Sequence, residues 1–338
     1  MTISNPHPLI TVMVPCFNQA GVIEGALASI FKQSYKNFEV IISDDCSTDN
    51  TNEIVLKFIE LNKLNHQRIK YFKNKTNLGY LKNYHCTLFT RAKGEWAINL
   101  DGDDFFIDRN FFQNAVNKIQ KNPSANLVCA NYKEFYPEKN LWIPIKNTLP
   151  EIMTSSQFLG FYGQGKVLWN HNALMYKTSV AKKIGFYWDS QQYKNDWESF
   201  LKLSTTGHII FYDEFVSAWV QHSANLTGGT ALNKFQDNFF LIQELNTFIT
   251  SKDISSKIRK KLLFYLVKIN VEGPATLILR KKEYSKFFKF ISLSIKEFKL
   301  TSITILLNPI IWMKFLLALS PSLYFFIKKI SRGAFNSF

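Results

Sequence analysis

Four consecutive residues behind a short apolar run are the strongest chemical signal in this sequence. Asp101, Gly102, Asp103 and Asp104 directly follow the run 96–100, which ends in Leu100. Carboxylates that crowd together at the end of a buried strand repel one another and lose solvation. A hard divalent cation removes both penalties, and Mg²⁺ is commonly held by one or two carboxylates together with substrate phosphates. The cluster therefore predicts a Mn²⁺ or Mg²⁺ site for a phosphorylated substrate, and an ordinary acidic turn is the alternative.

The elements that would position this cluster alternate between strands and helices. Short β-branched runs predict strands, and apolar residues at helical spacing predict helices between them. The predicted strands are 10–15, 38–43, 69–73, 96–100 and 125–131, and the predicted helices are 21–33, 52–62, 80–92 and 111–121. This alternation predicts an α/β fold with a mainly parallel sheet covered by helices, and it places the functional loops at the carboxyl ends of the strands.

The second half of the chain continues this pattern less regularly. A break is expected at Glu272-Gly273-Pro274, because glycine and proline rarely continue a helix. The last apolar segment, 303–330, is interrupted by prolines and a lysine, which leaves no run as long as the roughly 20 residues of a membrane-spanning helix. The other predicted segments are a strand at 172–176, a helix at 196–206, a strand at 208–211 and helices at 239–250 and 256–266.

The charge of the chain is concentrated near its C-terminal end. The 338 residues carry a net charge of +15, and residues 251–338 hold 17 Lys/Arg against 4 Asp/Glu. A nearly neutral body argues against nucleic-acid binding. A basic tail rich in Leu, Ile and Phe favours contact with an anionic membrane surface through amphipathic helices. A helical pair packed on the core of the protein itself is the alternative.

Several other classes of site are disfavoured. The four cysteines, Cys16, Cys46, Cys86 and Cys129, form no Cys-x-x-Cys pair, which argues against a zinc site and fits reduced thiols in the cytosol. The first eight residues do not look like a secretory leader. The sequence has no phosphate-binding loop, no Gly-x-Ser-x-Gly elbow and no His-Glu-x-x-His motif, so covalent serine chemistry and a zinc protease are not expected.

Two further strands end in polar residues, Pro15-Cys16-Phe17-Asn18 and Asp44-Asp45-Cys46-Ser47-Thr48, and with the acidic cluster these three strand ends would line one crevice of a parallel sheet. A fourth stretch, Asn195-Asp196-Trp197, places an acid at a helix start. In this order, and with the segment Gln33-Ser34-Tyr35-Lys36-Asn37-Phe38-Glu39, they resemble the family 2 glycosyltransferases, whose nucleotide-binding half is called the GT-A fold. The resemblance covers about residues 8–225. It implies a GT-A fold followed by a helical, amphipathic, basic tail.

The resemblance assigns nucleotide binding to the first two strand ends. Asp45 would accept the imide N–H of uracil, which cytosine does not offer, and Asp44 would hold the loop. Turn formation and helix capping are the alternative role for this loop. The other residues that the resemblance places beside the nucleotide are Pro15, Phe17, Asn18, Asn77, Gly79 and Lys82.

The resemblance assigns the metal and the donor contacts to the acidic cluster. Asp103 is the expected metal ligand and Asp104 the alternate one, with Mn²⁺ or Mg²⁺ as the cofactor. Asp101 and Gly102 are expected against the donor. His222 would bind the diphosphate or supply a further metal ligand, although a lone histidine can also be structural.

Asp196 corresponds to the general base of the family. It would take the proton from the acceptor hydroxyl as that oxygen attacks the anomeric carbon, and one such displacement inverts the configuration. Asn195 replaces the glutamate that usually precedes the base, which removes a neighbouring charge. A helix-capping role for Asp196 is also physically sound. His171 and Trp188 are candidates for contacts with a sugar, or core residues.

The resemblance therefore implies transfer of one sugar from a UDP-linked donor to a saccharide hydroxyl. The expected acceptor is a polyprenyl-diphosphate-linked oligosaccharide of a bacterial surface polysaccharide such as O-antigen, capsule or LPS. We expect a catalytic domain at 1–230, a helical extension at 231–300 and a peripheral membrane tail at 301–338, on the cytoplasmic face of the inner membrane. The sequence leaves a homodimer open.

Two other functions are compatible with parts of the pattern. A nucleotidyltransferase can use a related sheet and metal site, but it would need a Gly-rich basic loop that residues 15–21 do not offer. A non-catalytic basic membrane adaptor would explain the tail. The presence of Asp45, Asp103 and Asp196 together argues against it.

Overall fold

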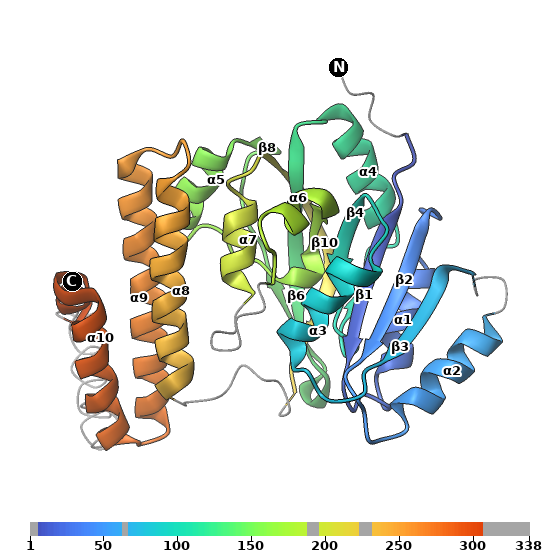
Figure 1. The fold of residues 1–338 in the computed structure, drawn as a ribbon, viewed down its shortest axis with the longest axis horizontal. Helices are drawn as coiled ribbons and strands as arrows, with labels where there is room; N and C mark the ends of the chain where they lie inside the picture. The colour runs from blue at the N-terminus through green and yellow to red at the C-terminus, as the bar shows by residue number, and fades with distance from the viewer. Residues whose placement is uncertain (1–5, 63–66, 188–195, 223–231, 307–338) are drawn as a thin grey trace, which may run out of the picture.

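A computed structural model describes residues 6–62, 67–187, 196–222 and 232–306. Its centre is a mixed, mostly parallel sheet of ten strands with helices on both faces (Figure 1). The strands are β1 (Ile10–Cys16), β2 (Phe38–Asp44), β3 (Ile69–Lys73), β4 (Trp96–Asn99), β5 (Phe105–Phe106), β6 (Ala125–Tyr136), β7 (Leu141–Ile145), β8 (Ile152–Met153), β9 (Leu174–Lys177) and β10 (His208–Val220). Their order is β3-β2-β1-β4-β9-β6-β10-β5, with β7 on β6 and β8 on β10.

The first four long strands form the parallel half of the sheet. β1 is parallel to both β2 and β4, and β2 is parallel to β3. The register places Cys16 opposite Asp44 and Met13 opposite Asn99, so the loops that follow β1, β2 and β4 leave the same edge. β1, β2 and β4 are buried along their whole length, which explains why they form continuous apolar runs instead of alternating patterns. The predicted α/β architecture is confirmed for this half.

The other half of the sheet contains a reversed strand that the sequence did not reveal. β9 is antiparallel to both of its neighbours, β4 and β6, whereas β6 and β10 are parallel to each other. β6 and β10 also extend well beyond the predicted ends at 131 and 211. They do so because they pair with each other along most of their length, and β6 pairs with β7 as well. These strands therefore depend on contacts between distant residues.

Two apolar clusters lie on opposite faces of the sheet. Met13 and Ile41 belong to one, and the neighbouring Val12 and Val40 belong to the other, as the strand alternation requires. Helices α1, α2 and α4 cover the second face, and the remaining helices lie on the first. The helices are α1 (Ile23–Phe31), α2 (Thr51–Leu61), α3 (Tyr80–Cys86) with a π-helical turn (Thr87–Arg91), α4 (Phe111–Lys121), α5 (Ser155–Tyr162), α6 (Thr178–Lys183), α7 (Trp197–Leu203), α8 (Leu232–Thr250), α9 (Ser256–Arg280) and α10 (Tyr284–Leu306).

Helix α9 packs against α5 and helix α8 against α7, and α10 packs on the outer side of α8 and α9 (Figure 1). The approach is close at the end of α5, where a Cβ on Gly163 would lie 2.9 Å from the Leu262 nitrogen of α9. The predicted break at Glu272-Gly273-Pro274 is wrong, because α9 continues through Pro274. Val271, Ala275 and Ile278 are buried on either side of the proline, so tertiary packing offsets the lost backbone hydrogen bond.

Helix α9 is long and apolar enough to cross a membrane, judged by length and composition alone. Of its most apolar stretch of 18 residues, 39% is buried inside the protein. A core helix of a soluble protein meets the same criteria. Of the predicted tail, 301–338, only the end of α10 belongs to the described residues. The domain boundaries at 230 and 300 and the membrane-seeking tail therefore stay predictions.

Candidate functional site

The acidic cluster lies directly beyond β4, against the end of β1. Gly102 makes this close approach: a Cβ there would lie 2.3 Å from Gln19 Oε1 and 3.3 Å from Cys16 Cβ. A larger residue would first have to displace the Gln19 side chain, which lies against this turn. The glycine thus sets the distance between the acidic cluster and the polar turn that follows β1.

Asp104 is the buried anchor of the cluster, with 2% of its surface exposed. Its Oδ2 accepts a hydrogen bond from Asn172 Nδ2 at 2.9 Å, and its Oδ1 accepts one from the Val220 backbone at 2.9 Å. Burial, followed by the charges of Asp101 and Asp103, raises the pKa of Asp104 well above its usual value. Both oxygens are engaged, so Asp104 ties the turn to β10 and to the segment before β9.

Asp103 and His222 face each other, as a joint role would require. Asp103 Oδ2 lies 2.8 Å from His222 Nε2, and the exposed side-chain fractions are 19% and 31%. Burial, and then the charge of Asp101, raises the pKa of Asp103, although the hydrogen bond with His222 opposes this shift. Asp103 thus combines partial solvent access with a nitrogen ligand beside it.

His171 connects Asp101 to Asp196. It lies in a 3₁₀ turn (His171–Ala173) directly before β9. Its Nδ1 is 3.2 Å from Asp196 Oδ2, and its Nε2 is 3.1 Å from Asp101 Oδ2. Burial would lower the pKa of His171, but the Asp101 carboxylate and then Asp196 raise it well above its usual value. The same pairing lowers the pKa of Asp101 against the effect of burial.

Asp196 stands at the start of α7 but does not cap it. No side-chain capping hydrogen bond is formed at this position, and the carboxylate turns towards His171 instead. The capping alternative considered for Asp196 is therefore not the role that the structure shows. Asp196 lies beside the acidic cluster although it comes 92 positions after Asp104 in the chain.

The residues present fit a divalent cation. Ligand atoms of Asp101, Asp104 and His171 lie within 4.8 Å of one another. His171 Nε2 is buried and lacks an aligned hydrogen-bond partner despite its proximity to Asp101. Carboxylate oxygens with imidazole nitrogens suit Mn²⁺, and oxygens alone suit Mg²⁺. Asp101, Asp103 and Asp104, with His171 or His222, would hold the ion, which would offset the negative charge of a bound diphosphate.

Asp45 organises the loop that follows β3. Its Oδ1 accepts hydrogen bonds from Asn74 Nδ2 at 2.9 Å and from the Leu78 backbone at 2.8 Å, and its Oδ2 accepts one from the Gly79 backbone at 2.8 Å. Asp45 is 3% exposed. Oδ2 keeps one lone pair for a further donor. The predicted contact of Asp45 with a base stays a prediction, and the loop-holding role is observed.

Asp44 holds the neighbouring loop, as expected. Its Oδ1 accepts from the Ser47 backbone at 2.7 Å, and its Oδ2 accepts from Tyr71 Oη at 2.7 Å. Asn18 joins this loop to the end of β1, because its backbone donates to Ser47 Oγ and its Oδ1 accepts from the Thr48 backbone. The ends of β1 and β2 thus form one rigid polar unit.

The other predicted donor residues surround this unit. Phe17 is 45% exposed next to Asn18, and Pro15 is buried at the end of β1. Asn77 Oδ1 accepts from the Gly79 backbone at 3.0 Å, and Gly79 has φ of +82°, which favours glycine. Lys82 lies one turn into α3 and is half-buried. Trp188 and Asn195 lie outside the described residues.

A buried polar floor below the acidic cluster was not predicted. Tyr84 donates its hydroxyl to Asp101 Oδ1 and stacks on Tyr187 with ring centroids 5.0 Å apart. Asn99, two residues before the cluster, donates to the Tyr187 hydroxyl and accepts from Tyr176 Oη at 3.0 Å. These residues fix the orientation of Asp101. The sequence does show polar residues within these apolar segments, which is a sign of buried hydrogen bonds. It does not show which of these residues bind one another.

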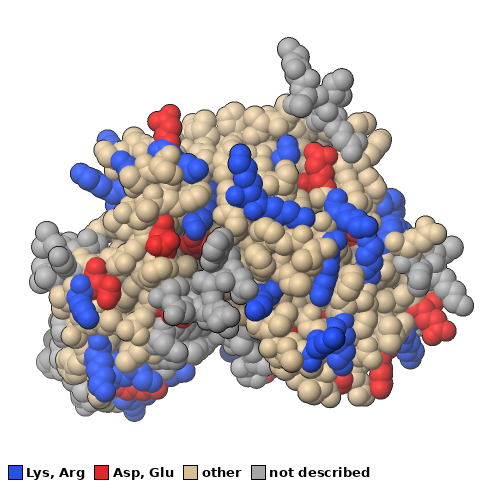
Figure 2. All heavy atoms as spheres, in the orientation of Figure 1, with Lys and Arg blue, Asp and Glu red and all other residues tan. Residues whose placement is uncertain are grey.

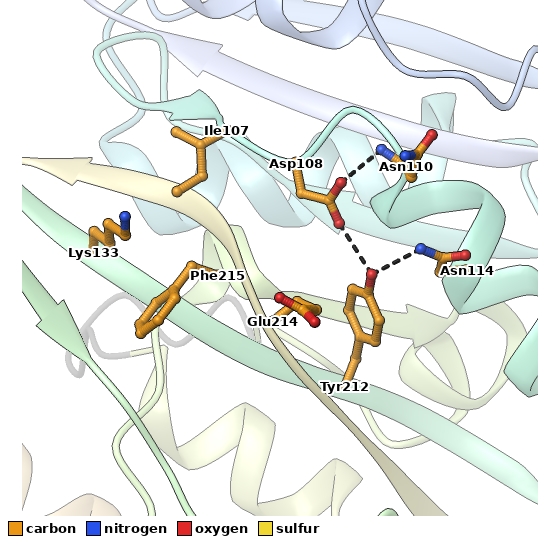
Figure 3. A pocket seen from close by; sticks show the side chains of 8 residues that line it. All are labelled: Ile107, Asp108, Asn110, Asn114, Lys133, Tyr212, Glu214 and Phe215. Atoms are coloured by element: carbon orange, nitrogen blue, oxygen red, sulfur yellow. Dashed lines mark hydrogen bonds between the residues drawn. The ribbon is translucent and has the colours of Figure 1, made fainter.

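A separate cavity of about 430 Å³ lies where β10 bulges beside the start of α4 (Figure 3). Asp108 accepts hydrogen bonds there from the Asn110 backbone and from Tyr212 Oη, which in turn accepts one from Asn114. None of the predicted site residues lines this cavity. The predicted chemistry therefore belongs to the strand ends and not to this cavity.

Comparison with known proteins identifies the family. The sequence profile of glycosyl transferase family 2 matches residues 11–184, from β1 to the end of α6. The chain belongs to glycosyl transferase family 2. It is therefore a nucleotide-sugar-dependent glycosyltransferase, which confirms the resemblance and the enzyme class read from the sequence. The matched residues include Asp45 and the acidic cluster, whereas Asp196 and His222 lie beyond them.

A sequence relative and two solved structures extend this assignment. The chain is 30% identical over 145 residues to the Escherichia coli enzyme named UDP-Glc:alpha-D-GlcNAc-diphosphoundecaprenol beta-1,3-glucosyltransferase WfaP, which covers 43% of this chain and 53% of WfaP. The chain thus spans about half the length of that relative. The crystal structure of residues 1–349 of Staphylococcus aureus TarS in complex with UDP aligns with a TM-score of 0.67 and 19% identity, over 90% of this chain and 86% of that one.

The second structure is the mannosyltransferase PcManGT from Pyrobaculum calidifontis in complex with GDP-Man and Mn²⁺. It aligns with a TM-score of 0.56 and 17% identity, over 89% of this chain and 80% of that one. At these identities the likeness of both structures shows the fold, a GT-A-like α/β sheet followed by C-terminal helices.

Proposed function

We propose that this protein transfers a single sugar from a UDP-linked donor to a hydroxyl of a saccharide acceptor, with inversion at the anomeric carbon. The observation that carries the proposal is the position of Asp196. Asp196 stands at the start of α7, but its carboxylate makes no capping hydrogen bond to that helix. Instead, the imidazole of His171 bridges the carboxylate to Asp101 of the acidic cluster. A base therefore stands beside a site built for a diphosphate, which is the pairing that a single displacement requires.

The residues of the chain divide the work between binding and proton transfer. Asp196 takes the proton of the acceptor hydroxyl as the oxygen attacks the anomeric carbon. The loops held by Asp44, Asp45 and Asn18 provide a rigid binding surface for the nucleoside. A rigid surface lowers the entropy cost of ordering the loops when the donor binds. A divalent cation at the acidic cluster supplies charge neutralisation for the leaving diphosphate.

Uridine is the proposed nucleoside because Asp45 Oδ2 keeps a lone pair free beside its bond to the Gly79 backbone. The imide N–H of uracil could donate to that lone pair. The TarS structure was solved with UDP, and the name of WfaP specifies UDP-Glc. Both support a uridine donor for this chain.

For the acceptor, we propose a polyprenyl-diphosphate-linked saccharide of bacterial surface polysaccharide synthesis. The name of WfaP specifies a diphosphoundecaprenol-linked acceptor.

We also propose that the C-terminal helices attach the protein peripherally to the cytoplasmic face of the inner membrane. Phe264 of α9 and Phe288 and Ile295 of α10 are exposed, next to Lys261 and Lys289. Figure 2 shows basic side chains on the C-terminal helices. Exposed apolar side chains with lysines favour an anionic lipid surface.

The first test is hydrolysis and transfer with a panel of nucleotide sugars, with and without Mn²⁺, for the wild type and Asp103→Ala. Asp253→Ala, in the exposed turn between α8 and α9, is the matched control. We expect release of a nucleoside diphosphate from one UDP-sugar that depends on the metal and is lost in Asp103→Ala only. Absence of both turnover and UDP–Mn²⁺ binding in the wild type would contradict the proposed function.

The membrane part is tested separately by sedimentation with vesicles. We expect the full chain to bind vesicles that contain phosphatidylglycerol, to release them at high salt, and to bind more weakly after Phe288→Ser and Ile295→Ser. Equal binding to neutral vesicles would count against electrostatic attachment.

A further inference from the structure

We propose that His171 is a positioning residue that holds the carboxylate of Asp196 in the orientation needed for proton transfer. The inference rests on the proposed function, because it assigns a partner to the general base of that reaction. The observation is a bridge in which one imidazole contacts two carboxylates. Nδ1 lies 3.2 Å from Asp196 Oδ2, and Nε2 lies 3.1 Å from Asp101 Oδ2.

The contact to Asp196 has the character of a directed hydrogen bond. A general base has to be an ionised carboxylate, which only accepts, so the proposed role requires Nδ1 to be the donor in this contact. The contact to Asp101 is different, because Nε2 is close to Asp101 but not aligned for a hydrogen bond. Nδ1 therefore carries the directional interaction, and it points at the base.

The turn that carries the imidazole is fixed by hydrogen bonds, and the ring has an aromatic neighbour. Asn170 begins the turn and accepts a hydrogen bond from the Asn172 backbone at 3.1 Å. Asn172 is tied to Asp104 at 2.9 Å and to Ser217 at 2.8 Å. The ring of Tyr84 lies 6.0 Å from the ring of His171. A side chain held in this way, 16% exposed, can hold its neighbour in place in turn.

Asp196 needs such a partner because α7 does not provide one. The carboxylate makes no capping hydrogen bond to the helix that follows it. Without His171, rotation about the side-chain bonds would move the basic oxygen away from the acceptor hydroxyl. A displacement of about 1 Å at a reacting group can cost on the order of a hundredfold in rate.

Two isosteric replacements separate the two contacts of His171. The amide nitrogen of asparagine takes the place of Nδ1, and the amide nitrogen of glutamine reaches the place of Nε2. His171→Asn therefore keeps a donor for Asp196, whereas His171→Gln keeps one for Asp101 only. His171→Ala removes both, and His208→Asn, at the start of β10 and far from the cluster in the chain, is the matched control.

The experiment measures kcat and KM for the UDP-sugar that the wild type uses, and thermal protection by UDP with Mn²⁺. We expect kcat to fall about a hundredfold in His171→Ala and His171→Gln. This loss should exceed any change in donor KM or UDP–Mn²⁺ protection, which can also respond because His171 Nε2 lies beside the proposed metal site. His171→Asn should recover at least a tenth of the wild-type kcat, and His208→Asn should match the wild type.

Three results would overturn the positioning role. A wild-type kcat in His171→Ala would remove the need for the contact. Recovery by glutamine but not by asparagine, or a loss confined to donor KM and UDP–Mn²⁺ protection, would assign His171 to Asp101 and the donor instead. In each of these results the wild type still turns over the donor, so the proposed function stands. A wild type without turnover or UDP binding would remove that function, and the inference with it.

Discussion

The two ends of the central sheet treat buried carboxylates in opposite ways. At the amino end, Glu39 is 5% exposed, and its oxygens accept from Thr11 Oγ1 at 2.7 Å, the Lys93 backbone at 2.8 Å and Lys70 Nζ at 2.6 Å. These donors lower the pKa of Glu39 although burial opposes the shift. At the carboxyl end, burial and neighbouring carboxylates raise the pKa values of Asp103 and Asp104.

This difference separates a structural carboxylate from the candidate functional ones. Glu39 has a donor for each contact, so its charge stabilises the fold. The negative charges of the aspartates beyond β4 repel one another. This repulsion lowers the stability of the fold until a cation or a cationic side chain neutralises part of the charge. Groups whose ionisation is disfavoured in this way are concentrated at functional sites. Asp104 is as buried as Glu39, with exposed fractions of 2% and 5%, so burial alone would not have distinguished these two carboxylates.

The largest expected effect comes from removing the base at the carboxyl end. Asp196→Asn should lower turnover of the UDP-sugar by about a thousandfold, because an amide cannot accept the acceptor proton. Binding of UDP with Mn²⁺ should be unchanged. Steady-state kinetics with thermal-shift titrations checks both. Glu198→Gln, on the same helix but paired with Lys202, is the control, and more than a tenth of wild-type turnover in Asp196→Asn would contradict the assignment.

The second effect comes from removing the metal. Treatment with EDTA should lower turnover by about a hundredfold or more, because several kcal/mol of charge stabilisation at the diphosphate are lost. Addition of Mn²⁺ should restore it. Thermal protection by UDP should likewise need the ion in the wild type and be absent in Asp103→Asn. Turnover that is indifferent to EDTA would show that the acidic cluster works without a cation.

A pair of glycines contrasts the two ends of the sheet. A Cβ on Gly94, at the amino end, would lie 2.5 Å from the Thr11 nitrogen and 2.7 Å from the Trp96 oxygen, whereas on Gly102 it would displace mainly the flexible Gln19 side chain. Gly94→Ala should therefore lower the free energy of unfolding by about 1–3 kcal/mol, and Gly102→Ala by less. Urea denaturation measures both. Gly102→Ala should instead raise donor KM, and an equal loss of stability in both variants would refute the contrast.

The smallest effect concerns pH at the amino end. Because the pKa of Glu39 is lowered in the folded state, its contribution to stability is present above its unfolded pKa of about 4.3 and is lost as pH falls through the folded value. Glu39→Gln should thus cost about 1–2 kcal/mol at pH 7, and the difference from the wild type should shrink towards pH 3. Urea denaturation at several pH values tests this. A difference that is independent of pH would indicate that packing, not charge, explains the loss.

Local signals in the sequence predicted most of the fold in the N-terminal part of the chain. The helix expected at 111–121 and the strand at 69–73 have the predicted bounds, because continuous apolar patterns and flanking polar residues define them locally. The reversed β9 and the extensions of β6 and β10 were missed, since they depend on strand pairing between distant residues. The expected break at Pro274 failed for the same reason, because buried contacts outweighed local propensity.

The site was predicted in its parts but not in its connections. Asp101, Asp103 and Asp104 were found because they are contiguous, and the pairing of Asp103 with His222 agrees with the expected metal or diphosphate role. The bridge from Asp101 through His171 to Asp196 joins three segments that are far apart in the sequence. No spacing between residues could therefore predict these contacts. Nor did the sequence show that Asp45 already binds the Leu78 and Gly79 backbones.

The close contact between Gly163 and Leu262 links the C-terminal helices to the catalytic sheet through α5. Because two backbones meet there without an intervening side chain, α9 cannot tilt or slide without moving α5 as well. We therefore expect α9 to move together with α5 and with β8 and β10, which α5 contacts. Any surface on which these helices rest will set the angle at which the mouth of the site faces that surface, and with it the height above the surface from which an acceptor can be reached.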